Sequence, residues 1–265
     1  MKHLQKAVHW FSPNRTVDAQ TEFLLMIMWV ALMIFAWISF GAKYLPTPSE
    51  VLGAFPGLWY DQGLGQELAT SMALNLQAIS IMFVMSYALA IFSVTPAGAS
   101  LAKIVSLGRF NGFVGLPLIF MSILHNHHDT KVALLVFGMG VFTVLSLTKL
   151  FDSIPKDLFD HSRTLRMGEW RVVWEVVVLG TFDSVIDILL INIAMGWMML
   201  PTIEYRFQNE GGIGALMEVQ NKHLNLDSVL CALFVILLVG VTQDWLLRIF
   251  KNLSCPYASK GMERK

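Results

Sequence analysis

The chain has 265 residues, of which 55 % are hydrophobic and 14 % are charged, against about 25 % charged residues in an ordinary soluble domain. Its 19 basic and 19 acidic residues cancel, so the composition gives no sign of nucleic-acid binding. Residues 23–40 carry no charge, and a run of this length is close to the ~20 apolar residues that cross a ~30 Å hydrocarbon core. The composition therefore excludes a soluble chain and predicts an all-α protein that spans a lipid bilayer several times.

Six apolar stretches follow one another and predict about six transmembrane helices. They are residues 23–40, 72–94, 110–124, 132–151, 184–200 and 229–250. The first is too long for the apolar part of a typical signal peptide and lacks a small-residue cleavage pattern after it, so we interpret it as a retained helix. The third is short for a span, and Gly112, Gly115 and Pro117 are expected to bend or interrupt its helix.

The distribution of positive charge predicts the orientation in the membrane. With six spans and a cytoplasmic N-terminus, the outer segments hold few basic residues, namely Lys43, Lys131, Arg206 and Lys222. This bias fits the positive-inside rule and predicts that both termini are cytoplasmic. The expected divisions are a cytoplasmic N-terminal segment at 1–22, a transmembrane domain at 23–250 and a cytoplasmic tail at 251–265.

Two long loops separate the predicted spans. The outer loop starts at residue 43 and has two prolines that favour an extended entry, with Ser49 as the expected N-cap of a short helix. The cytoplasmic loop at about 152–183 has Pro155 where a first helical turn would begin and Gly168 farther along. We therefore expect two short helices joined by a turn in this loop.

Four short motifs lie between residues 44 and 250. They are LPTPSEVL at 45–52, DHSRTLRMGEW at 160–170, Trp197 with Glu204 and GGIG at 211–214, and GVTQD at 240–244. In their order and spacing they resemble the permease subunits of bacterial ABC importers, specifically the nitrate/taurine/sulfonate (NitT/TauT) group. The second motif is similar to that family's cytoplasmic EAA loop, whose pattern is Glu-Ala-Ala, three residues, then Gly.

The EAA-like motif departs from the family pattern at several positions. Asp160 replaces the family's Glu, and His161 and Ser162 replace its two alanines. The position of the family's Gly is Arg166, with Gly168 two residues later.

The resemblance implies a type I importer permease with a MetI-like fold in the bacterial inner membrane. Its implied partners are cytoplasmic ABC ATPase subunits, an extracytoplasmic substrate-binding protein and a second permease copy in a homodimer. The implied solute is small and anionic, such as nitrate, bicarbonate, taurine or a sulfonate. No Gly-x-x-x-x-Gly-Lys-Ser/Thr motif occurs, so ATP hydrolysis is expected in the partner and not in this chain.

The resemblance also implies that the loop at 155–170 couples the permease to the ATPase. Asp160 is expected near a helix start, where its carboxylate complements the helix dipole, and Leu165 is the expected apolar anchor. The alternative is a solvated amphipathic loop whose charges only follow the inside bias. The candidate coupling residues are Asp160, Ser162, Arg163, Leu165, Arg166 and Gly168.

Polar residues within the predicted spans are candidates for a translocation path. Asp183 and Asp187 share a helical face, and Asp187 lies about one turn deeper, so it takes either a pathway role or a structural role as partner of another helix. The path candidates are Asn75, Gln77, Asp187, Asn192, Trp197 and Glu204.

An imidazole cluster at His125, His127 and His128 suggests a second class of function, a small metal-dependent membrane enzyme. We expect instead a solvated outer turn, because one short loop does not supply ligands that converge from several helices. We predict no cofactor, no metal and no disulfide between Cys231 and Cys255.

Overall fold

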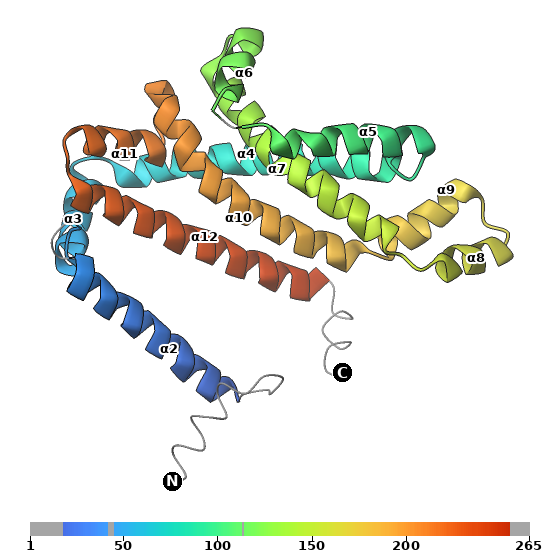
Figure 1. Ribbon diagram of the computed structural model, residues 1–265, viewed down its shortest axis with the longest axis horizontal. Coiled ribbons are helices and arrows are strands. Elements are labelled where there is room, and N and C mark those ends of the chain that lie inside the picture. The colour runs from blue at the N-terminus through green and yellow to red at the C-terminus, as the bar shows by residue number, and fades with distance from the viewer. Residues whose placement is uncertain (1–17, 42–44, 113, 255–265) are drawn as a thin grey trace.

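A computed structural model describes residues 18–41, 45–112 and 114–254, and the described residues are helical, with no strand among them (Figure 1). Residues 1–17 of the expected N-terminal segment and 255–265 of the expected tail, Cys255 included, lie outside the described residues. The elements are α2 (Ala19–Ala36), η1 (Trp37–Gly41), α3 (Pro48–Tyr60), α4 (Leu64–Phe92), α5 (Pro96–Leu107), η2 (Gly108–Phe110), α6 (Leu116–Leu124), α7 (His127–Asp152), α8 (Lys156–Thr164), α9 (Glu169–Val172), η3 (Val173–Leu179), α10 (Phe182–Arg206), η4 (Gln208–Glu210), α11 (Ile213–Lys222) and α12 (Leu226–Ser254).

Five helices among the described residues are long and apolar enough to cross a membrane. They are Gln20–Ser39, Leu64–Phe92, His127–Asp152, Phe182–Arg206 and Leu226–Leu253. They correspond to the first, second, fourth, fifth and sixth apolar stretches of the sequence, and most extend beyond the predicted bounds. The predicted all-α, multi-span fold is therefore confirmed.

The third apolar stretch is not one continuous helix. Its residues belong to the end of η2, an irregular segment, and α6, which has only nine residues. At 1.5 Å per residue α6 is roughly 14 Å long, about half of the hydrocarbon thickness. The predicted span at 110–124 is thus corrected, while the predicted interruption is confirmed: Gly115 is the N-cap of α6 and Pro117 lies in its first turn.

The helices run alternately between two ends of the bundle. The N-terminal parts of α4 and of α7 both contact the region where α10 ends, since Ser71 bonds to Glu204 and Lys131 pairs with Glu210. The chain must therefore return to this end between α4 and α7, and α5 with α6 makes that return pass in two pieces (Figure 1). We call this end of the bundle the α11 end and the opposite one the α8 end.

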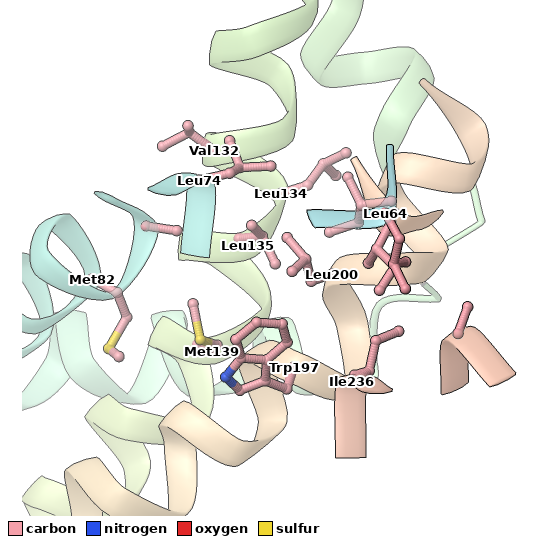
Figure 2. Close-up of a cluster of buried hydrophobic side chains, with 14 of the residues drawn as sticks. Leu64, Leu74, Met82, Val132, Leu134, Leu135, Met139, Trp197, Leu200 and Ile236 are labelled. Carbon is pink, nitrogen blue, oxygen red and sulfur yellow. The ribbon is translucent and has the colours of Figure 1, made fainter. Parts of the chain in front are cut away.

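Apolar side chains from α4, α7, α10 and α12 fill the centre of the bundle (Figure 2). Among them are Leu74, Met82, Leu135, Met139, Trp197, Leu200 and Ile236. A glycine in α10 lets the helices approach closely, because a Cβ at Gly196 would lie 2.8 Å from both Asn75 Oδ1 and Met139 Sδ. The middle of the described bundle is therefore packed with side chains.

α2 lies apart from the bundle (Figure 1). Its large apolar residues are exposed around the helix, including Phe23 and Phe35, and none of its apolar window is buried. Trp37, directly after α2, stacks on Phe234 of α12 with ring centroids 5.7 Å apart. A helix that is apolar on all sides is suited to contact with lipid or with another membrane helix.

α3 begins earlier than predicted, and its N-cap is Thr47 instead of Ser49. The Thr47 hydroxyl accepts the Glu50 N–H at 3.4 Å, and the Glu50 carboxylate accepts the Thr47 N–H at 2.7 Å. This reciprocal capping box satisfies the backbone donors of Thr47 and Glu50, and Pro48 stands at the first helical position, where its missing N–H costs nothing.

Candidate functional sites at the two ends of the bundle

The segment between α7 and α10 projects from the α8 end of the bundle (Figure 1). It contains α8, a turn at 165–168, α9 and the π-helical stretch η3 that leads into α10. The prediction of two short helices with a turn between them is confirmed. We call residues 155–172 the α8–α9 segment.

Arg163 closes the turn of the α8–α9 segment. Its Nε and Nη2 donate to the two carboxylate oxygens of Glu169 at 3.2 and 3.1 Å, and its Nη1 donates to Asp160 at 3.4 Å. The hydrogen bonds and the opposite charge hold the pKa of Glu169 below its ordinary value and raise the pKa of Arg163. This two-pronged contact fixes α8 relative to α9.

Asp160 is not at the start of its helix, contrary to prediction. α8 begins at Lys156, and Asp157 is the acid in its first turn. The Asp160 carboxylate instead lies beside Arg163 on the helix surface, with 70 % of its side chain exposed. A direct ion pair with Arg163 thus replaces the predicted interaction with the helix dipole.

The turn holds one residue in the left-handed conformation. Arg166 has φ of +55°, in the region that glycine adopts most easily, and the resemblance described above puts the glycine of the EAA pattern at this position. Gly168 does not take over this role, because its φ is −66° and a Cβ there would meet nothing within 4 Å.

Two further candidates near the end of α8 differ in exposure. Leu165 ends the helix with 59 % of its surface exposed, an apolar side chain presented to its surroundings. Ser162 is buried, and its hydroxyl donates to the Leu158 carbonyl oxygen at 2.9 Å. Leu165 is thus free for contact with a partner, and Ser162 belongs to the inner face of α8.

At the α11 end, α4 and α10 hold the start of α11 through buried hydrogen bonds. The backbone N–H of Gly212 donates to the Glu67 carboxylate, and that of Ile213 donates to Ser71 Oγ at 2.8 Å. The N–H of Gly214 donates to Glu204 Oε2 at 3.0 Å, and Glu204 is only 1 % exposed. Glu204 therefore binds α11 and does not line an open groove.

The GGIG motif is required by this close approach. Gly211 and Gly212 have φ of +74° and +108°, and a Cβ at Gly212 would lie 2.5 Å from Glu204 Oε1. A Cβ at Gly214 would lie 2.8 Å from Glu204 Cβ and would also clash with the carbonyl oxygen of Pro201. Side chains at these positions would push the Glu67 and Glu204 carboxylates away from the backbone N–H groups whose hydrogen bonds they accept.

The three histidines contact separate partners. His127 and His128 are the first residues of α7, not loop residues as predicted. His127 Nε2 lies 3.1 Å from Asn209 Nδ2. His125 Nδ1 lies 3.0 Å from the carbonyl oxygen of Ile123, two residues earlier in the chain. Among the described residues, no three His, Cys, Asp or Glu side chains gather in a group that could hold a metal ion.

His128 and Lys131 share one carboxylate. His128 Nδ1 and Lys131 Nζ lie 3.4 and 3.5 Å from Oε2 of Glu210, in the short turn after α10. His128 Nε2 also lies 3.0 Å from Gln77 Oε1 on α4. Lys131 is 1 % exposed, so this contact gives a buried ammonium its counter-charge.

The remaining path candidates lie at separate places. Asn75 is fully buried between helices, and neither side-chain atom has a hydrogen-bond partner within the described part of the chain. Asn192 donates to the Ile188 carbonyl oxygen of its own helix at 2.7 Å. Trp197 Nε1 donates to Gln243 Oε1 on α12 at 2.5 Å.

Trp197 also lines a groove of about 570 Å³ between α10 and α12, together with Pro201, Ile236 and Gly240. Asp187, at the α8 end, accepts from Lys251 Nζ on α12 at 2.5 Å. The structure thus gives Asp187 an interhelical partner, and it does not bring the six path candidates together.

Comparison with known proteins decides the family. A family model described as "Binding-protein-dependent transport system inner membrane component" matches residues 19–252. The chain belongs to this family. It is thus a multi-pass inner-membrane protein and an ABC importer permease subunit.

Two solved structures are similar in fold. A crystal structure titled as an amino acid ABC transporter with histidines gives a TM-score of 0.60 at 11 % identity, covering 75 % of this chain and 97 % of that chain. An inward-facing MetNI methionine ABC transporter gives a TM-score of 0.58 at 15 % identity, covering 74 % and 95 %. No curated protein matches the permease in sequence.

Family membership favours the transport subunit over the metal-dependent enzyme. The homologues support a non-catalytic transport subunit whose partners are an ATPase and a binding protein. The metal-dependent enzyme is not supported by the comparisons, and the three histidines do not converge.

Several residues of these sites escaped the sequence analysis of the permease. They are Glu67, Ser71, Lys131, Glu210, Gln243 and Lys251. Gln243 lies inside the GVTQD motif, and Lys131 is one of few basic residues on the predicted outer side, so both carried a signal. Glu67 and Ser71 carried none, because their partners are more than 130 residues away in the chain.

Proposed function

We propose that the permease belongs to the NitT/TauT group and imports a small anionic solute, coupled to a cytoplasmic ATPase through the α8–α9 segment. The observation that carries the proposal is the turn of this segment, where Arg166 takes the left-handed conformation at the position of the EAA-loop glycine. The same turn presents the exposed Leu165 beyond the end of the bundle. A projecting helix with an apolar tip is suited to insertion into a cleft of another protein.

The charge bias supports an orientation with the α8 end in the cytoplasm. The α8–α9 segment carries Lys156, Arg163, Arg166 and Arg171, as the positive-inside rule requires of a cytoplasmic loop. With α5 and α6 as one pass, the chain makes six passes, and both termini are then cytoplasmic. The α11 end faces outward, where a binding protein would deliver its solute.

A homodimer is the assembly that fits a translocation path. Among the described residues, apolar side chains fill the centre of one bundle, which favours a path between two chains over a path inside one. The groove between α10 and α12 opens on the surface of the bundle, and its lining includes the exposed apolar side chains of Met198 and Leu237. We therefore propose that two copies form the path between them, and that movement of their α8–α9 segments alternates its access.

The coupling role is tested by Leu165→Asp, with Leu224→Asp as the matched control. Both leucines are exposed and lie in turns next to a helix end, but Leu224 is at the opposite end of the bundle. Leu165→Asp is expected to abolish co-purification of the ATPase while the permease remains in the membrane, and Leu224→Asp is expected to retain it. Equal recovery of the ATPase with both variants would contradict the coupling role.

A further inference from the structure

The turn that follows α10 covers a buried cation at the α11 end. Lys131 is 1 % exposed, although an ammonium group is costly to bury without a counter-charge. Its nearest carboxylate oxygen, 3.5 Å away, is Oε2 of Glu210, whose side chain is 34 % exposed. His128 approaches the same oxygen from the neighbouring turn of α7.

The other nearby carboxylates are already engaged. Glu67 and Glu204 accept backbone amides at the start of α11, and Glu204 also accepts the hydroxyl of Ser71. Asp129 accepts from the Asn126 side-chain amide at 3.0 Å. Glu210 is the carboxylate among the described residues that pairs directly with both Lys131 and His128.

Glu210 is held differently from the residues that follow it. The amides of Gly212, Ile213 and Gly214 are fixed by buried acceptors on α4 and α10. Glu210 reaches α7 through its charged side chain, and Gly211, with φ of +74°, separates it from the fixed amides. Movement of residues 207–211 away from α7 breaks the Glu210 contacts, the exposed Asn209–His127 contact and the packing of Phe207 on His127, while the bonds of the amides at 212–214 stay in place.

We propose that Lys131 and His128 form a binding site for a small anion, occupied here by the chain's own Glu210 carboxylate, and that residues 207–211 are its lid. The chemistry fits a carboxylate, a sulfonate or a monovalent inorganic oxyanion, each of which replaces the Glu210 carboxylate charge for charge. An external anion that binds Lys131 displaces Glu210, so the lid opens when the anion is bound. The inference rests on the proposed import of an anionic solute.

The test uses the full complex in lipid nanodiscs, with methanesulfonate as the anion and dimethyl sulfone as its neutral counterpart. Hydrogen–deuterium exchange of the amides at 207–211 reports the opening of the lid. In the wild-type complex, exchange is expected to rise with methanesulfonate and to stay constant with dimethyl sulfone. Glu210→Gln removes the tethered competitor, so the methanesulfonate binding midpoint, measured in both complexes by isothermal titration calorimetry, should fall about tenfold or more.

Matched variants separate the site from a general charge effect. Asp244→Asn removes an acid that pairs with Arg248 within α12, at 2.7 Å, and should leave the midpoint unchanged. Lys131→Met should abolish the response and Lys131→Arg should retain it. Because Glu210 is partly exposed, Glu210→Gln remains informative even where Lys131→Met fails to fold.

Three results would overturn the inference: no response of the wild-type complex, an equal response to the neutral sulfone, or an unchanged midpoint in Glu210→Gln. Failure of this inference is distinct from failure of the proposed function. A complex that contains the ATPase but shows no anion response removes only the lid and its site. A chain that never associates with an ATPase removes the proposed function, whatever its response to anions.

Discussion

The Ser71 hydroxyl lies 2.7 Å from Oε1 and 2.8 Å from Oε2 of the Glu204 carboxylate, and both residues are buried. They are 133 positions apart in the chain, on α4 and α10. Ser71 also accepts the N–H of Ile213, so a single hydroxyl joins three helices. The α11 end is consequently a rigid unit made of α4, α10 and α11.

Ser71→Ala should destabilise this unit. The change leaves the Ile213 amide without its acceptor and removes a donor from a buried carboxylate, which typically costs about 1–3 kcal/mol. Thermal unfolding of the purified permease in detergent measures the effect. Ser100→Ala is the control, because that exposed hydroxyl bonds only to Pro96 in its own helix, at 3.2 Å; equal stability of both variants would contradict the joining role of Ser71.

Gly214→Ala should be more disruptive than an alanine at an unconstrained glycine. The new Cβ would clash with the carbonyl oxygen of Pro201 and lie 2.8 Å from Glu204 Cβ, so α11 must move away from α10. Such overpacking usually costs about 1–3 kcal/mol. Gly53→Ala in α3 is the matched change, since a Cβ there meets nothing within 4 Å. A lower yield and melting temperature for Gly214→Ala alone is the expected outcome.

Arg166→Gly should stabilise the α8–α9 turn. A non-glycine residue in the left-handed region costs roughly 1 kcal/mol, and glycine removes this strain. Hydrogen–deuterium exchange in residues 160–170 should decrease in the variant. Gly168→Ala should change it little, because Gly168 has φ of −66° and open space around it. Faster exchange in Arg166→Gly would show that the arginine side chain, and not the backbone strain, dominates this turn.

Asp187→Lys should weaken the contact between α10 and α12 at the α8 end, because it places two cations together. The exchanged pair, Asp187→Lys with Lys251→Asp, should recover most of the loss, since it restores the attraction across the two helices. Thermal stability of the two single variants and the double variant gives the coupling between them. A double variant no more stable than the less stable single variant would contradict a stabilising role of the Asp187–Lys251 pair.

Hydropathy was sufficient to predict the fold class, because each span needs a long run of apolar residues in the chain itself. The interruption at Gly115 and Pro117 and the turn near Gly168 were also predictable, since glycine and proline act on the local backbone. The role of Glu204 was not, because its partners Ser71 and Gly214 meet it only after helices distant in the sequence have packed.

Local rules also failed where several signals competed. Thr47 and Ser49 are both residue types that favour the N-cap position. Thr47 is the N-cap of α3 because it forms reciprocal hydrogen bonds with Glu50. Lys251 was assigned to a tail on the basis of its position after the last apolar residues. The helix continues past it, and its ammonium reaches back to Asp187 on α10.

The central claim is that this chain is the permease subunit of an ATP-driven importer. The most direct test is gentle solubilisation of the native membrane, capture of the chain and native mass spectrometry of what it carries. The account predicts a complex of two permease chains with two copies of an ATPase, which hydrolyses ATP. A chain recovered alone, or with no ATPase at any stoichiometry, would contradict it.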